Sequence, residues 1–152
     1  DKKKIIRALE VYKKTGKTIT VDSSRNLKYN FHLYVLTDER TSLYENINKR
    51  VDNMLEAGLV EEVRSLVKQY DLNENSQSMK AIGYREVIPY INNQMDYDTM
   101  VEKLKQDTRR YAKRQLTWFR KIEDAIWLDK SLLSKEDMVL KIIGDVNWIL
   151  NF

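Results

Sequence analysis

The sequence predicts a mainly α-helical chain, in which a helical assembly packs beside one buried strand. Glycine and proline are scarce, with four and one among 152 residues, which favours long helices over many short strands. Apolar residues recur at helical spacing along most of the chain. The exception is NFHLYVL, residues 30–36, which is short, aromatic and almost continuously apolar. This pattern is typical of a strand buried on both faces, as in a parallel sheet.

The first helix is expected over residues 2–14, where Ile5, Ile6 and Leu9 fall at helical spacing, with Gly16 as its C-terminal cap. Residues 16–28 are expected to form a loop before the strand. A lone strand cannot satisfy its own backbone groups, and no partner is obvious, since residues 127–129 (WLD) predict at best a minor strand. Because the chain also opens directly as a helix, we expect it to be a fragment of a longer protein.

Five more helical segments follow the strand, and several carry end signals. Thr37 or Asp38 can cap the first, Asp96 can cap a long helix over residues 97–122, and SKED (134–137) is a capping box for the last. Pro89 should bend or end the helix around it. The helices are expected in TDERTSLYENINKRVDNMLEAG, LVEEVRSLVKQY, AIGYREVIPYIN, residues 97–122 and the segment after SKED, with DLNENSQS as a loop.

The long helix separates into two faces when it is projected at about 100° per residue. Its apolar and aromatic residues share one side, which predicts that the aromatic rings lie mostly in the core: Met100, Val101, Leu104, Tyr111, Ala112, Trp118, Phe119 and Ile122. The basic residues form a continuous stripe on the remainder, with Asp107 as the lone acid beside them: Lys103, Lys105, Arg109, Arg110, Lys113, Arg114, Arg120 and Lys121.

The stripe has two interpretations, a solvated helix face or a surface that binds a polyanion. Arginine outnumbers lysine between residues 108 and 120, and acidic partners at i,i+4 are nearly absent, which favours the polyanion. Binding of single-stranded RNA there would show a log–log salt slope of about −0.7 per neutralised phosphate.

Composition excludes several classes of site. No cysteine and one histidine exclude a disulfide framework, a thiolate metal site and a His-rich metal site, and no run is long enough for a transmembrane helix. The net charge of +4 does not by itself prove a nucleic-acid partner. We expect a cytoplasmic protein. Carboxylates such as Glu61, Glu62, Glu86 and Glu102 fall on ordinary helix surfaces in this pattern, which indicates a substrate-binding portion without its own reaction centre.

Four further residues or motifs could carry chemistry. TGKT (15–18) fails as a phosphate loop because Val11 stands where the earlier glycine is needed. His32 is expected to be packed or hydrogen-bonded within the strand. Arg85, after Gly83 and Tyr84, is either a surface arginine or one directed at a phosphate. Arg40, after the strand, either pairs with Glu39 or Glu45 or lies on the phosphate side of a ligand site.

Four segments together resemble the C-terminal half of the tRNA dimethylallyltransferase (tRNA isopentenyltransferase) family: RALEVYKKTGK (7–17), residues 43–66, KAIGYREVIPY (80–90) and TRRYAKRQLTWFR (108–120). The resemblance implies transfer of a dimethylallyl group from its diphosphate to the exocyclic amine of the adenosine 3′ of the anticodon. It also implies an α/β P-loop NTPase-like fold with a parallel core sheet. Residues 1–28 would then end a helical tRNA-binding insertion, and residues 29–152 would supply the returning core strand and the C-terminal helical region.

By the same resemblance, Arg85 matches a position that contacts the diphosphate. Mg²⁺ would be bound largely by the missing N-terminal part, with no metal ligand in this chain, and the partners would be a tRNA anticodon stem-loop and dimethylallyl diphosphate. We expect a monomer that binds no membrane and a chain that is inactive alone. The alternatives are a non-catalytic RNA-binding helical module and a structural bundle with a soluble basic face. The residues expected at the tRNA are Lys3, Lys4, Ile5, Ile6, Arg7, Arg109, Arg110, Tyr111, Ala112, Lys113, Arg114, Gln115 and Arg120.

Overall fold

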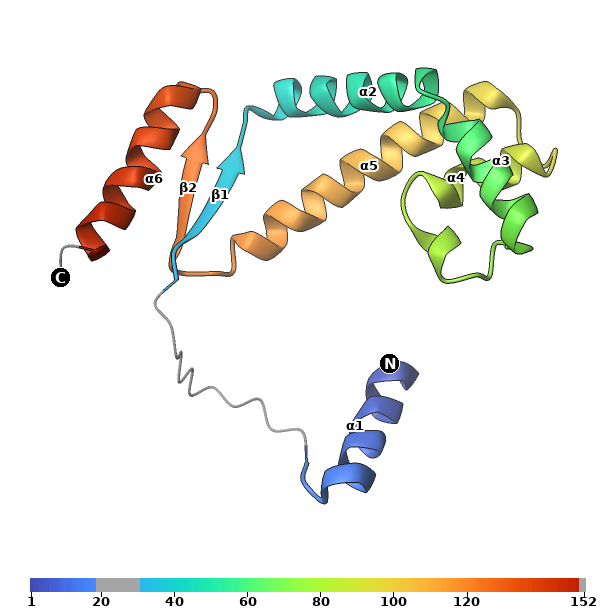
Figure 1. Ribbon diagram of the computed structural model, residues 1–152, viewed down its shortest axis with the longest axis horizontal. Coiled ribbons are helices and arrows are strands. Elements are labelled where there is room, and N and C mark those ends of the chain that lie inside the picture. Colours follow the sequence, from blue (N-terminus) through green and yellow to red (C-terminus); the bar gives the residue numbers. More distant parts are fainter. Residues whose placement is uncertain (19–30, 151–152) are drawn as a thin grey trace. The chain divides into compact units, whose positions relative to one another are not determined.

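The computed structural model describes residues 1–18 and 31–150, which belong to two compact units, Asp1–Phe31 and His32–Phe152. The first unit contains α1 (Lys2–Thr15), shown in Figure 1. Gly16 closes α1 with a φ of 68°, and its N–H donates to Tyr12 O at 2.8 Å, which confirms the predicted C-terminal cap. The loop predicted over 16–28 lies outside the described residues from position 19 onward.

The second unit is mainly helical, as predicted. Its core is a cluster of side chains from four α-helices and one short 3₁₀ helix, including Val51, Val63, Val87, Met100 and Leu104. In chain order its elements are β1 (Leu33–Thr37), α2 (Arg40–Glu56), α3 (Leu59–Tyr70), the short 3₁₀ helix η1 (Ser78–Lys80), α4 (Tyr84–Ile91), α5 (Tyr97–Phe119), β2 (Ala125–Asp129) and α6 (Lys135–Leu150).

The sheet contains a second strand, β2, in the segment where the sequence predicted at best a minor strand. β1 and β2 pair in parallel, with Leu33 opposite Ala125 and Thr37 opposite Asp129, so β1 has a partner in this chain that was not obvious from the sequence. The ladder begins at Leu33, two residues after the first described position of the predicted strand. Val35 is buried but Leu36 is 62% exposed, so within the described chain β1 is not covered on both faces.

Most predicted helix ends are confirmed. Asp96 Oδ1 accepts from the Thr99 N–H at 2.9 Å, and Ser134 Oγ accepts from the Asp137 N–H at 3.1 Å. Pro89 lies inside α4, which ends two residues later. The cap of α2 was predicted wrongly: the Glu39 carboxylate, rather than Thr37 or Asp38, accepts from Thr41 N and Ser42 N. The hydrogen bond from the Ser42 N–H lowers the pKa of Glu39.

The C-terminal part of α5 is less covered than its pattern predicted. α5 contributes Met100, Val101 and Leu104 to the core cluster, all from its first third. Tyr111 is 45% exposed and Trp118 is 61% exposed, so the prediction that the aromatic rings lie mostly in the core was wrong for these two. α2 and α5 lie close together where α2 ends and α5 begins, and they diverge toward the C-terminal end of α5 (Figure 1), which leaves that part of α5 less covered.

No helix in the described ranges is both long and apolar enough to span a membrane.

Candidate functional site

The start of α4 depends on a glycine. Gly83 is buried and has φ 102° and ψ −63°, a conformation that side chains disfavour. Its N–H donates to Glu86 Oε2 at 2.8 Å, which satisfies one of the free amides at the helix N-terminus. Glycine suits this position because it adopts this φ without the strain that a side chain would add.

Glu86 corrects a prediction from the sequence, which placed it on an ordinary helix surface. Its side chain is 0% exposed. Its two oxygens have different partners. Oε2 accepts from the Gly83 N–H, whereas Oε1 accepts from Arg85 Nε at 2.8 Å and lies 2.5 Å from Arg85 Nη2. A buried carboxylate is tolerated when a cation and hydrogen-bond donors surround it, and Glu86 has both.

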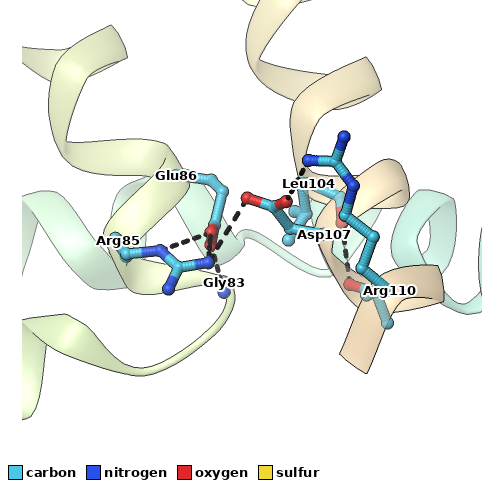
Figure 2. Close-up of polar contacts among 7 residues, drawn as sticks. Gly83, Arg85, Glu86, Leu104, Asp107 and Arg110 are labelled. Atoms are coloured by element: carbon cyan, nitrogen blue, oxygen red, sulfur yellow. Dashed lines mark hydrogen bonds and ion pairs between the residues drawn. The ribbon is translucent and has the colours of Figure 1, made fainter. Parts of the chain in front are cut away.

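Arg85, the residue predicted at the diphosphate, has a 49% exposed side chain that two carboxylates hold along one edge. Nη2 also lies 3.3 Å from Asp107 Oδ2 on α5 (Figure 2). The hydrogen bond to Glu86 is the main cause that raises the pKa of Arg85, so the guanidinium stays charged. The two N–H groups of Nη1 have no hydrogen-bond partner among the described residues, which leaves this edge available for an oxyanion.

Asp107 links Arg85 to the basic residues of α5. Its Oδ1 accepts from Arg110 Nη1 at 3.3 Å, while Oδ2 faces Arg85 (Figure 2). The acid that looked isolated in the sequence therefore has two arginine partners from different helices. Arg85, which was predicted to contact the diphosphate, and Arg110, which was predicted to contact the tRNA, therefore share Asp107 as a partner.

The basic stripe itself divides into two groups. Lys105 and Arg109 face α2, because Lys105 Nζ lies 2.7 Å from Asp52 Oδ1 and Arg109 Nη1 donates to Asn48 Oδ1 at 2.5 Å. The second group is exposed, and apart from Arg110, which pairs with Asp107, its members make no ion pair among the described residues: Lys103, Arg110, Lys113, Arg114, Arg120 and Lys121. The guanidinium carbon of Arg114 lies 5.9 Å from the centre of the Tyr111 ring.

Two of the cavities along α5 contain residues predicted at the site. The larger, of about 780 Å³, is lined by α2, α5 and the segment before α4, and it includes Gly83, Tyr111, Ala112 and Gln115. The smaller, of about 260 Å³, lies where β1 ends and is lined by Arg40, Lys113 and Arg120 among others.

Arg40 forms neither of the ion pairs that its neighbours offer. Glu39 is occupied by the α2 cap, and the Arg40 guanidinium lies over the Tyr44 ring, 5.2 Å from its centre. Arg40 instead faces the same cavity as Lys113 and Arg120, so three cations converge beside the carboxyl end of β1. One of the two interpretations of the sequence placed Arg40 here, on the phosphate side of a ligand site.

The remaining predicted residues lie elsewhere. Lys3, Lys4, Ile5, Ile6 and Arg7 are all exposed on α1, in the first unit, where Arg7 lies 3.7 Å from Glu10. His32 is exposed, and its ring stacks on Tyr34 with the ring centres 6.4 Å apart.

Metal ligands do not gather in the described part of the chain. No three histidine or carboxylate side chains there converge in a way that could hold a metal ion. The described residues therefore offer no cluster of three protein ligands for a magnesium ion.

Comparison with known protein families shows that residues 1–122 match the model of the family described as IPP transferase. Over 144 residues the chain is 46% identical to the tRNA dimethylallyltransferase of Acetivibrio thermocellus, an alignment that covers 91% of the chain and 45% of that protein. The chain thus spans about half the length of the curated relative it matches.

Solved structures agree with this match. The tRNA Δ2-isopentenylpyrophosphate transferase of Staphylococcus epidermidis superposes with a TM-score of 0.74 and 43% identity over 96% of the chain and 48% of that protein. For the full-length tRNA isopentenylpyrophosphate transferase of Bacillus halodurans, the TM-score is 0.75 and the sequence identity is 36%, over 98% of the chain and 45% of that protein. For a eukaryotic dimethylallyltransferase acting on tRNA, the TM-score is 0.80 and the sequence identity is 26%, over 99% of the chain and 41% of that protein.

Proposed function

Because the chain belongs to the IPP transferase family, we propose that it forms part of an enzyme that transfers a dimethylallyl group from dimethylallyl diphosphate to tRNA. The acceptor in this proposal is the exocyclic N6 of the adenosine 3′ of the anticodon. The observation that carries the proposal is the placement of Arg85, whose charged guanidinium has a free Nη1 edge among the described residues and lies one carboxylate away from Arg110. We also propose that residues 1–28 belong to a helical insertion and residues 29–152 to the core.

Arg85 would act on the leaving group. In the transfer, N6 of adenine forms a bond to C1 of the dimethylallyl group, the C1–O bond breaks, and the diphosphate leaves with the bonding electron pair. Negative charge therefore grows on the diphosphate oxygens, and the Nη1 donors of Arg85 would stabilise it. The proton released from N6 goes to a base that we place outside this chain, as we do the magnesium expected from the family.

The basic residues would hold the RNA. An adenosine must leave its stack before its amine can react, and this unstacking costs free energy. Contacts from Arg110, Lys113, Arg114 and Arg120 to backbone phosphates would offset part of that cost and set the orientation of the stem-loop. Lys3, Lys4 and Arg7 on α1 would supply a second group of contacts.

The test is a transfer assay with the full-length protein, expressed with whatever sequence precedes Asp1 in its reading frame. Labelled dimethylallyl diphosphate and an anticodon stem-loop with adenosine after the anticodon are the substrates. Label in that adenosine, absent when it is replaced by guanosine, supports the proposal. A stem-loop that binds without becoming labelled would instead support the alternative, a non-catalytic basic helical RNA-binding module.

A further inference from the structure

Two carboxylates compete for one nitrogen of Arg85. Nη2 lies 2.5 Å from Glu86 Oε1 and 3.3 Å from Asp107 Oδ2, so two negative charges surround one positive charge (Figure 2). A diphosphate approaching this arginine would meet both carboxylates, and like charges at short range repel. At least one of the two pairs should therefore change when the diphosphate binds.

Glu86 is the partner that cannot leave. It is fully buried, and its other oxygen holds the N–H of Gly83 at the start of α4. Separating Glu86 from Arg85 would leave a buried carboxylate without a cation, which is strongly unfavourable. Glu86 also accepts from Nε of Arg85, a contact that fixes the plane of the guanidinium.

Asp107 is the partner that can leave. Its side chain is 18% exposed, and its contact with Arg85 is the longer one. If Oδ2 loses Arg85, Oδ1 still accepts from Arg110 at 3.3 Å. The carboxylate then stays paired with a cation, so the exchange leaves no isolated charge.

We propose that Glu86 is the fixed positioning residue of Arg85 and that Asp107 is an exchangeable partner, which the diphosphate displaces from Nη2 while Asp107 stays paired with Arg110. This inference rests on the proposed function, because it needs a diphosphate at Arg85. It assigns opposite effects to two carboxylates that touch the same arginine. Glu86 favours diphosphate binding by orienting the donors, and Asp107 opposes it by competing for one of them.

The test measures binding of inorganic pyrophosphate to the full-length protein by calorimetry at fixed ionic strength and magnesium concentration. Glu86→Gln should weaken binding by about tenfold, the scale of one charge-assisted hydrogen bond. Glutamine can still accept from the Gly83 N–H, which makes it the conservative change. Asp107→Asn should tighten binding by about threefold or more, because a nearby negative charge is removed.

A loss of folding can only weaken binding, so it cannot account for tighter binding by D107N. Unchanged or weaker binding by D107N overturns the inference, and so does unchanged binding by a folded E86Q. If E86Q does not fold, D107N alone decides, since Asp107 is partly exposed on α5. Arg85→Ala separates a failure of the proposed function from a failure of this inference. If Arg85→Ala binds pyrophosphate as tightly as the wild type, the proposed role of Arg85 is wrong. If Arg85→Ala loses pyrophosphate binding while D107N binds no more tightly than the wild type, only the proposed displacement of Asp107 is wrong.

Discussion

Arg109 donates a hydrogen bond from Nη1 to Oδ1 of Asn48 at 2.5 Å, and this contact joins α5 to α2. An ion pair between the same two helices, from Lys105 to Asp52 at 2.7 Å, lies one turn earlier on α5. Residues that look equivalent in the basic run of the sequence therefore have different roles. Those that face α2 support the fold, and those that face away are available to a polyanion.

Arg109→Ala should lower the free energy of unfolding by about 1 kcal/mol, the typical contribution of one hydrogen bond. Urea denaturation followed by circular dichroism measures it. Arg114→Ala is the matched control on the same helix, because Arg114 is exposed and makes no hydrogen bond among the described residues. Its effect should stay within about 0.5 kcal/mol. Equal destabilisation by both variants would remove the distinction between the two groups.

Charge reversal on the outer face should act on RNA instead. Arg110→Glu combined with Arg114→Glu should weaken stem-loop binding and flatten its log–log salt dependence by about 0.7 for each phosphate that is no longer neutralised. Filter binding across a salt series measures both quantities. Arg64→Glu combined with Lys68→Glu on α3, where both residues are exposed, controls for the same change in net charge. An affinity and a slope that match those of the control would exclude α5 from the RNA site.

Local signals predicted the caps well. Asp96 and Ser134 cap their helices as expected, because an N-cap depends on residues within three positions of each other. The positive φ of Gly83, 102°, is likewise a local property, and glycine is the residue that tolerates it best.

The wrong predictions concern pairings between segments that are distant in sequence. β2 was underestimated because its partner β1 lies about ninety residues earlier, and a five-residue run has no periodicity that identifies its neighbour. Glu86 was expected on a helix surface, but α4 turns it into the protein, where Arg85 neutralises it. Tyr111 and Trp118 fall on the apolar side of α5, yet no core side chain covers that side beyond Leu104 in the described chain.

Arg85→Ala in the full-length protein should lower kcat by about a hundredfold or more, because in the proposed function it removes a charge that would stabilise the departing diphosphate. Stem-loop affinity should change far less, since the proposal assigns the RNA contacts to other residues. The kcat of Arg85→Lys, which keeps the charge but lacks the planar donors, should lie between those of the wild type and Arg85→Ala. Steady-state kinetics measure kcat, and a direct binding assay measures the stem-loop affinity. A turnover number that survives the alanine substitution would contradict the assignment.

Acid should weaken the start of α5. Hydrogen bonds from the backbone N–H and the hydroxyl of Thr99 lower the pKa of Asp96 below its ordinary value of 3.8. A lowered folded-state pKa means that the stabilisation is complete above 3.8 and is lost as the pH falls through the folded-state value. The difference in melting temperature between the wild type and Asp96→Ala should therefore shrink below pH 3.8. A constant difference across a pH series of thermal melts would show that the charge of Asp96 has no part in it.

Two glycine-to-alanine substitutions should change stability in opposite directions. Gly83 has a φ of 102°, and an added Cβ would meet only Met54 Cε at 3.9 Å, so the cost of alanine comes from backbone strain and not from a clash. Strain of this kind is about 1–3 kcal/mol, and G83A should be less stable by that amount. Gly144 lies exposed within α6 with nothing within 4 Å of the added atom, and G144A should gain up to about 1 kcal/mol from helix propensity. Urea denaturation of both variants measures the two changes in stability.

The same two variants should also differ in pyrophosphate affinity. Because the Gly83 N–H donates a hydrogen bond to Glu86, G83A should reduce pyrophosphate affinity while G144A leaves it unchanged. A G83A protein as stable as the wild type would mean that α4 begins with a different backbone conformation.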